Sequence, residues 1–100
     1  MIRHLVMFKL REFNNPRDKM YAALAVRAEL ISMKEKIEVI REFEVGINFT
    51  PDDAAFDLVI NSSFDTKEDL ETYRTHPDHQ AFILFNKQYS VKKVIVDYEY

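Results

Sequence analysis

A short segment in the last third of the chain carries most of the side chains that could do acid–base chemistry. It runs Tyr73-Arg74-Thr75-His76-Pro77-Asp78-His79 and holds two of the three histidines. Imidazole titrates nearest to neutral pH, so His79 could act as a general base toward an acidic C–H group. The Tyr73 hydroxyl could hold a carbonyl oxygen while negative charge develops on it. Structural roles are the alternative: His79 bonded to backbone or to Asp78, and Tyr73 as a core aromatic residue with its hydroxyl at the rim.

The two other histidines have structural readings as well. His76 precedes Pro77, which biases it away from helical dihedrals, so we expect it to cap a helix or stabilise a turn. His76 and His79 are three residues apart, but the proline spoils the helical geometry and no third protein ligand is evident, so we predict no metal site. His4 lies among apolar residues and needs a partner if it is buried. We expect it to bond to the broken-helix segment, with a pocket-lining role as the alternative.

The composition argues against several other chemistries and partners. There is no cysteine and only one glycine, which excludes thiolate chemistry, disulfides and a Gly-rich phosphate loop. No motif points to a cofactor, and we predict none. The net charge is −3 with the two signs interleaved, which argues against nucleic acid and anionic membrane surfaces as partners. The apolar run at the start is too short for a signal sequence or a membrane span, so we predict a cytoplasmic protein.

The spacing of apolar residues predicts the elements that must position these side chains in a single domain spanning residues 1–100. Alternation with a period of two predicts four strands, at residues 2–11, 39–49, 55–64 and 91–100. Helical spacing predicts one helix over residues 16–37 and a second that opens at Thr66, breaks, and resumes at Pro77. On the first helix we expect an apolar stripe made of Met20, Ala23, Leu24, Leu30, Ile31 and Ile37.

The element order βαββαβ favours a ferredoxin-like α+β sandwich, a four-stranded antiparallel sheet with its helices on one face. The first and third strands would be central, which agrees with apolar residues on both sides of the first strand. The other sheet face would then be open to water, and we expect Leu5, Met7, Val59 and Ile95 on it. Because an exposed apolar patch of this kind marks an interface, we predict a homodimer that packs sheet to sheet.

Four stretches carry a family resemblance, and together they span essentially the whole chain. They are Arg3–Leu10, Phe64–Leu70, Tyr73–Phe82 and Val94–Tyr98. On these stretches the chain resembles the stress-responsive α/β-barrel domain (Dabb) family, for which the strand histidine combined with Tyr-x-x-His-Pro-x-His is fairly specific. The resemblance implies an α+β barrel built from the sheets of two subunits, with a cavity between each sheet and its helices. It implies no single function, since most members have no assigned activity.

The family includes a plant polyketide cyclase that needs no cofactor and closes a linear polyketide by aldol condensation. Its strand histidine and its catalytic tyrosine and histidine match His4, Tyr73 and His79, which implies catalytic roles for Tyr73 and His79. Two further polar positions of that pocket are Leu24 and Leu58 here, so the resemblance does not extend to the cyclase's substrate. The expected pocket lining is His4, Phe8, Leu24, Leu58, His76 and Phe82.

Three functions therefore stay open. One is a non-catalytic dimer that binds a small apolar ligand or contributes to stress tolerance. Another is a cofactor-independent enzyme, cyclase-like or isomerase-like, with His79 as general base and Tyr73 as orienting donor. Haem or flavin handling is a third, by analogy with related barrels that are monooxygenases. Since bulky side chains such as Phe8 and Phe82 could fill the pocket, an open cavity near His79 discriminates between these readings.

Overall fold

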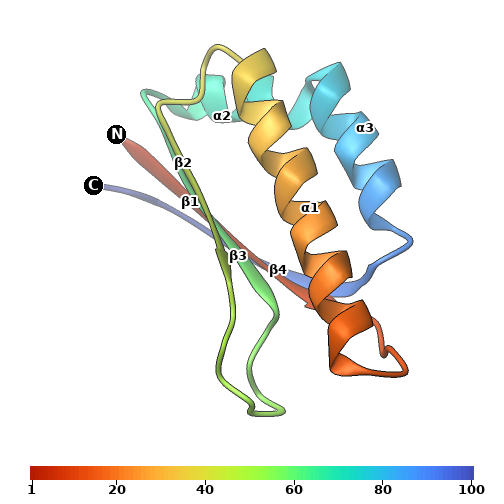
Figure 1. Ribbon diagram of the computed structural model, residues 1–100. Coiled ribbons are helices and arrows are strands. Elements are labelled where there is room, and N and C mark those ends of the chain that lie inside the picture. The colour runs from red at the N-terminus through yellow and green to blue at the C-terminus, as the bar shows by residue number, and fades with distance from the viewer.

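The computed structural model describes residues 1–100 and shows one sheet with helices packed against one of its faces (Figure 1). In chain order the elements are β1 (Ile2–Leu10), α1 (Pro16–Lys36), β2 (Glu42–Ile47), β3 (Leu58–Phe64), α2 (Lys67–Thr75), α3 (Pro77–Asn86) and β4 (Ser90–Glu99). This order confirms the predicted βαββαβ pattern and the break in the second helix. The two termini lie at the same end of the sheet (Figure 1). None of the helices combines the length and the apolar character needed to cross a membrane.

The sheet is antiparallel throughout, with the strand order β2-β3-β1-β4. The central positions of β1 and β3 are as predicted, and β2 and β4 form the edges. Alternate residues of β1 from Ile2 to Leu10 are buried against the helices. The apolar core therefore lies between the sheet and the helical layer, and any site on this side of β1 is covered by α2 and α3.

Side chains at the helix starts explain where each helix begins. Asn15 accepts a hydrogen bond from the Asp18 amide at 2.9 Å, and Thr66 accepts one from the Asp69 amide at 3.0 Å. His76 has extended backbone dihedrals, φ −63° and ψ 138°, as the residue before a proline prefers. Its Nδ1 atom accepts from the Asp78 amide at 3.1 Å, which confirms the predicted capping role of His76. The break between α2 and α3 is thus fixed by His76 and Pro77 together.

The buried face of α1 differs from the predicted stripe. The helix turns Ala22, Ala23, Val26, Leu30 and Met33 toward the core. Ala23, Leu30 and Ile37 are buried as predicted. Met20, Leu24 and Ile31 are exposed, so the prediction was wrong for these three. Apolar residues occur on both sides of this helix, so periodicity alone does not select the packed face. The small alanines select it, because they let α1 approach the sheet closely.

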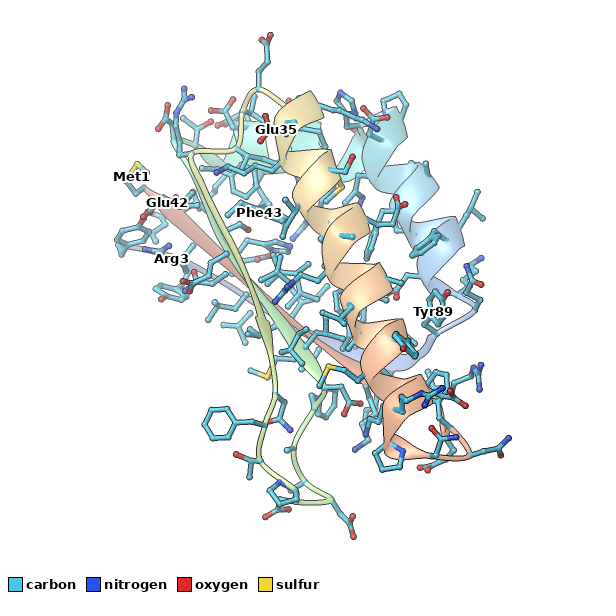
Figure 2. The ribbon with its side chains drawn as sticks, viewed as in Figure 1. Met1, Arg3, Glu35, Glu42, Phe43 and Tyr89 are labelled. Atoms are coloured by element: carbon cyan, nitrogen blue, oxygen red, sulfur yellow. The ribbon has the colours of Figure 1, made fainter.

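The sheet face away from the helices is apolar, with one correction to its membership. It carries Leu5, Met7, Val59, Val94, Val96 and Tyr98, which the strand register places on one side. Ile95 pairs with Val6 and therefore faces the helices, so its predicted place on the open face was wrong. Both sides of β4 are apolar near this point, and only the pairing with β1 decides which side faces out. Figure 2 shows Arg3 and Glu42 on this open side, while Phe43 points toward α1.

Candidate functional site

A cavity of about 470 Å³ lies between the helix-facing side of the sheet and the helices α2 and α3. Its volume falls within the range of small-molecule sites, which begins near ~300 Å³. The apolar part of its lining comes from both layers: Val6, Phe8, Tyr73, Ile60, Phe82, Ile83, Val91 and Ile95. The bulky aromatic side chains therefore leave the space open rather than filling it. The lining also includes His4 and His79, so the predicted acid–base residues lie at this cavity.

Three of the sequence-predicted residues meet at one end of this cavity. The ring centroids of Tyr73 and His79 are 4.6 Å apart, and those of His4 and Tyr73 are 5.8 Å apart. In an unbroken helix, residues six positions apart would point about 240° away from each other. The break at Pro77 removes that constraint and lets α3 bring His79 back against Tyr73. Two helices and β1 thus each contribute one side chain.

The hydrogen bond of His79 determines which of its nitrogens is available. Its Nδ1–H group donates to the backbone carbonyl of Arg74 at 3.0 Å, an oxygen that can only accept. The neutral ring therefore carries its proton on Nδ1 and leaves Nε2 without one. Burial lowers the pKa of His79, and the nearby charge of Lys93 lowers it further against the opposing effect of the Arg74 carbonyl. His79 is accordingly neutral at pH 7, the state that a general base requires.

The Tyr73 side chain is 1% exposed, yet its hydroxyl has no partner inside the protein. No buried side-chain nitrogen or oxygen in the chain lacks a hydrogen-bond partner, so this hydroxyl is not sealed within the core. It opens onto the cavity that Tyr73 lines. Burial raises the pKa of Tyr73 far above its ordinary value. The hydroxyl therefore stays protonated and can donate to an oxygen of a bound molecule.

His4 is held by a carboxylate that the sequence did not reveal as a site residue. Its Nδ1–H group donates to Asp97 on β4, and the other oxygen of Asp97 accepts from the Arg74 guanidinium. The predicted direct bond from His4 to the broken-helix segment was therefore wrong, since Asp97 stands between His4 and Arg74. Burial outweighs the attraction of Asp97 and lowers the pKa of His4. The signal for Asp97 lies in the strand register, which pairs it with His4.

The remaining predicted lining residues divide into two groups. Phe8 and Phe82 line the cavity, with ring centroids 6.0 Å apart. Leu24, Leu58 and His76 do not line it, which corrects the predicted lining at these positions. Leu24 is 39% exposed on the outer side of α1, and Leu58 is 2% exposed within the core. His76 instead caps the start of α3, where its Nδ1 atom accepts a hydrogen bond from the Asp78 amide.

Several polar lining residues were not singled out from the sequence. They are Arg74, Asn86, Lys87, Ser90, Lys92 and Lys93. The Asn86 side-chain oxygen accepts a hydrogen bond from Ser90 at 2.8 Å, which joins the end of α3 to the start of β4. No three histidine or carboxylate side chains converge as a metal site would require. The arrangement offers a base, a hydroxyl donor and apolar walls.

Comparisons with known proteins agree with this architecture. The family model described as stress responsive A/B barrel domain matches residues 2–100. An uncharacterised protein from Streptomyces coelicolor is 36% identical over 100 residues, which covers 100% of both chains. A solved structure from Bacteroides fragilis is described as a dimeric protein of unknown function with a ferredoxin-like fold. It is 31% identical to this chain with a TM-score of 0.87, and the match covers 99% of this chain and 95% of that one. A dimeric ferredoxin-like protein from Thermobifida fusca, at 20% identity and TM-score 0.81, matches 99% of this chain and 90% of its own and supports the fold alone.

Proposed function

The chain belongs to the stress responsive A/B barrel domain (Dabb) family, and we propose that it binds a small, largely apolar carbonyl compound and abstracts a proton from it. One observation carries this proposal. The unprotonated Nε2 atom of His79 and the unpartnered hydroxyl of Tyr73 belong to rings in contact at one end of an apolar cavity. A base and a hydrogen-bond donor side by side are what abstraction next to a carbonyl needs.

The chemistry would proceed through an enolate. The substrate carbonyl oxygen accepts a hydrogen bond from Tyr73, and His79 Nε2 takes a proton from the adjacent carbon. The C–H electron pair becomes the enolate, whose charge on oxygen is stabilised by the Tyr73 hydroxyl. The Arg74 carbonyl, accepting from Nδ1–H, stabilises the positive charge on the imidazolium that forms. Return of the proton to another carbon would isomerise the substrate. Attack of the enolate on a second carbonyl, with the proton passing to the new alkoxide, would close a ring.

Binding without turnover is a second candidate, and the apolar walls of the cavity favour it. Eight of its sixteen lining residues are hydrophobic, which is typical of sites that bind by burying apolar surface. A non-catalytic member would retain the ligand and release it unchanged. The two candidates share a binding step and differ only in proton transfer, so a single variant of His79 separates them.

We also propose that the protein is a homodimer through the open sheet face. Met7 and Val96 are 41% and 56% exposed there, and Leu5 and Val94 complete the strip. The solved structures from Bacteroides fragilis and Thermobifida fusca are described as dimeric, which supports a dimer here. At ~25 cal/mol per Å² of apolar surface, burying a few hundred Å² would contribute several kcal/mol to association. In this arrangement the cavity stays on the helix-facing side of each subunit.

The binding step can be tested by titrating the isotope-labelled protein with medium-chain ketones and aldehydes. We expect shifts in the NMR resonances of Tyr73, His79 and Ile95 and a raised Tm, because a ligand of the folded state stabilises it. Ile95→Trp should fill the cavity and remove both effects, while Ile31→Trp on the exposed side of α1 should leave them. If ligands shift only resonances outside the cavity, or bind Ile95→Trp equally well, the proposal is wrong.

A further inference from the structure

The cavity lining carries positive charge that the protein itself does not balance. Lys87, Lys92, Lys93 and Arg74 line it, and none of the sixteen lining residues is acidic. Arg74 is paired with Asp97, whereas the lysines that form ion pairs, Lys19 and Lys67, lie elsewhere. This concentration of cations occurs in a chain whose net charge is −3. The excess of positive charge is therefore local to the cavity and does not reflect the composition of the whole chain.

Lys93 is the cation that the fold alone does not explain. Lys87 follows the last residue of α3, where a positive charge is stabilised by the helix dipole. Lys92 is among the lining residues, but its pairing with Lys9 starts its side chain on the open face of the sheet, so its charge is not assigned to the cavity. Lys93 pairs with Phe8 and so begins on the helix-facing side, beside the apolar lining. Lys93 lines the same cavity as His4 and His79, and its charge contributes to lowering the pKa of both histidines.

We propose that the molecule bound here is an amphipathic carboxylate. Its apolar body would lie against Phe82, Ile83 and Ile95, and its carboxylate would face Lys93. This inference rests on the proposed function, because it uses the same cavity and adds the charge of the ligand. A carboxylate fits better than a phosphate, since the chain has no Gly-rich loop. In addition, α3 ends beside Lys87, and the negative end of a helix dipole disfavours a doubly charged anion.

The test compares two ligands of equal size that differ in charge. Octanoate and its neutral isostere octanamide are titrated into the full-length protein by calorimetry at low salt. We expect octanoate to bind about fivefold more tightly, the upper range for one exposed ion pair. The preference should shrink as salt is added, since the Debye length falls from about 30 Å at 0.01 M to about 10 Å at 0.1 M.

The variant Lys93→Met should bring the two affinities close together, because it keeps the long apolar stem and removes the charge. Lys34→Met is the matched control on α1, away from the cavity, and should keep the wild-type preference. Lys93 is exposed, so the variant should fold, and Lys93→Gln provides a second replacement. Equal binding of the two ligands to the wild type, or an unchanged preference in both Lys93 variants, would overturn the carboxylate inference alone. If neither ligand binds while neutral ketones do, the carboxylate inference is again wrong and the proposed function stands. If ketones also fail to bind, both are wrong.

Discussion

Tyr73 performs different tasks with different parts of one side chain. Its ring packs against Phe64 with centroids 5.2 Å apart and is part of the buried core. Its hydroxyl makes no bond within the protein and faces the cavity. Phenylalanine would supply the same packing, and because the hydroxyl opens onto the cavity, it can donate to a molecule bound there. The unpartnered hydroxyl thus points to a ligand.

This division of roles predicts how Tyr73→Phe behaves. The free energy of unfolding should change by less than about 0.5 kcal/mol, because no hydrogen bond is lost and the ring remains. Tyr73→Ala should cost about 3–5 kcal/mol, because it removes the ring and leaves a cavity. Urea unfolding of the three proteins measures both values. A loss above about 1.5 kcal/mol in Tyr73→Phe would mean that the hydroxyl has a structural partner, contrary to this account.

The histidines predict how stability changes with pH. Burial holds the pKa of His79 below its unfolded value of 6.5, so the unfolded chain takes up a proton first as pH falls. The resulting stability is fully present above about pH 6.5 and is lost as the pH falls through the folded pKa. Unfolding free energies measured from pH 7.5 to 5 should therefore fall less steeply in His79→Gln than in the wild type. An equal or steeper fall in His79→Gln would show that the His79 pKa is not depressed.

At the residue scale, the sequence predicts the side chains with acid–base chemistry but not the residues that hold them in place. Tyr73 and His79 stand out by type and because Pro77 lies between them, and His4 stands out as a histidine among apolar residues. Asp97 does not stand out, because a single aspartate in a strand is also an ordinary surface residue. Its role depends on the register that pairs it with His4 across 93 positions. No local pattern in the sequence carries that information.

At the scale of the elements, the break between α2 and α3 brings the side chains of the site together. His76 closes α2 and caps α3, and Pro77 prevents the two from merging. The proline and its preceding histidine are readable from the sequence because their constraints are local. The packed face of α1 was not readable, since that helix carries apolar residues on both sides. Which side meets the sheet depends on close approach through Ala22 and Ala23.

The cap predicts that His76 matters for stability and not for chemistry. His76→Ala removes the acceptor for the Asp78 amide, so unfolding free energy should fall by about 1 kcal/mol. His76→Asn supplies another capping acceptor and should recover most of that loss. Ligand affinity, measured by the same titrations as for the wild type, should stay within about twofold in both variants, since His76 does not line the cavity. A large loss of affinity with intact folding would place His76 in the site instead.

On the scale of the whole molecule, the open sheet face is the surface through which we propose that the protein dimerises. Its central residues are apolar and come from β1, β3 and β4. The ferredoxin-like arrangement and the exposed face followed from element order, since both helices must cover one side. Element order did not predict which residues of β4 lie on that face, because β4 is apolar on both sides near Ile95 and Val96. Only the pairing of Ile95 with Val6 resolves it.

This face predicts the effect of a single charge on assembly. Val96→Glu should convert the dimer to a monomer at micromolar concentration, because it buries a charge in an apolar interface. Ile31→Glu is the matched control, since Ile31 is about as exposed but lies on α1. Light scattering coupled to size-exclusion chromatography measures the mass of each protein. A wild-type monomer would contradict the dimer itself, and a dimer that survives Val96→Glu would show that the interface lies elsewhere.

The most direct test of the proposed function is exchange of a carbon-bound proton. In heavy water, a base that abstracts a proton next to a carbonyl replaces it with deuterium, and loss of the proton NMR signal of 2-octanone reports the rate. We expect the wild type to accelerate this exchange and His79→Gln to lose at least about a hundredfold of the acceleration, the low end for removing a general base. Tyr73→Phe should retain its fold and lose much of the rate. Exchange at the same rate in the wild type and in His79→Gln would contradict the assignment of His79 as the base.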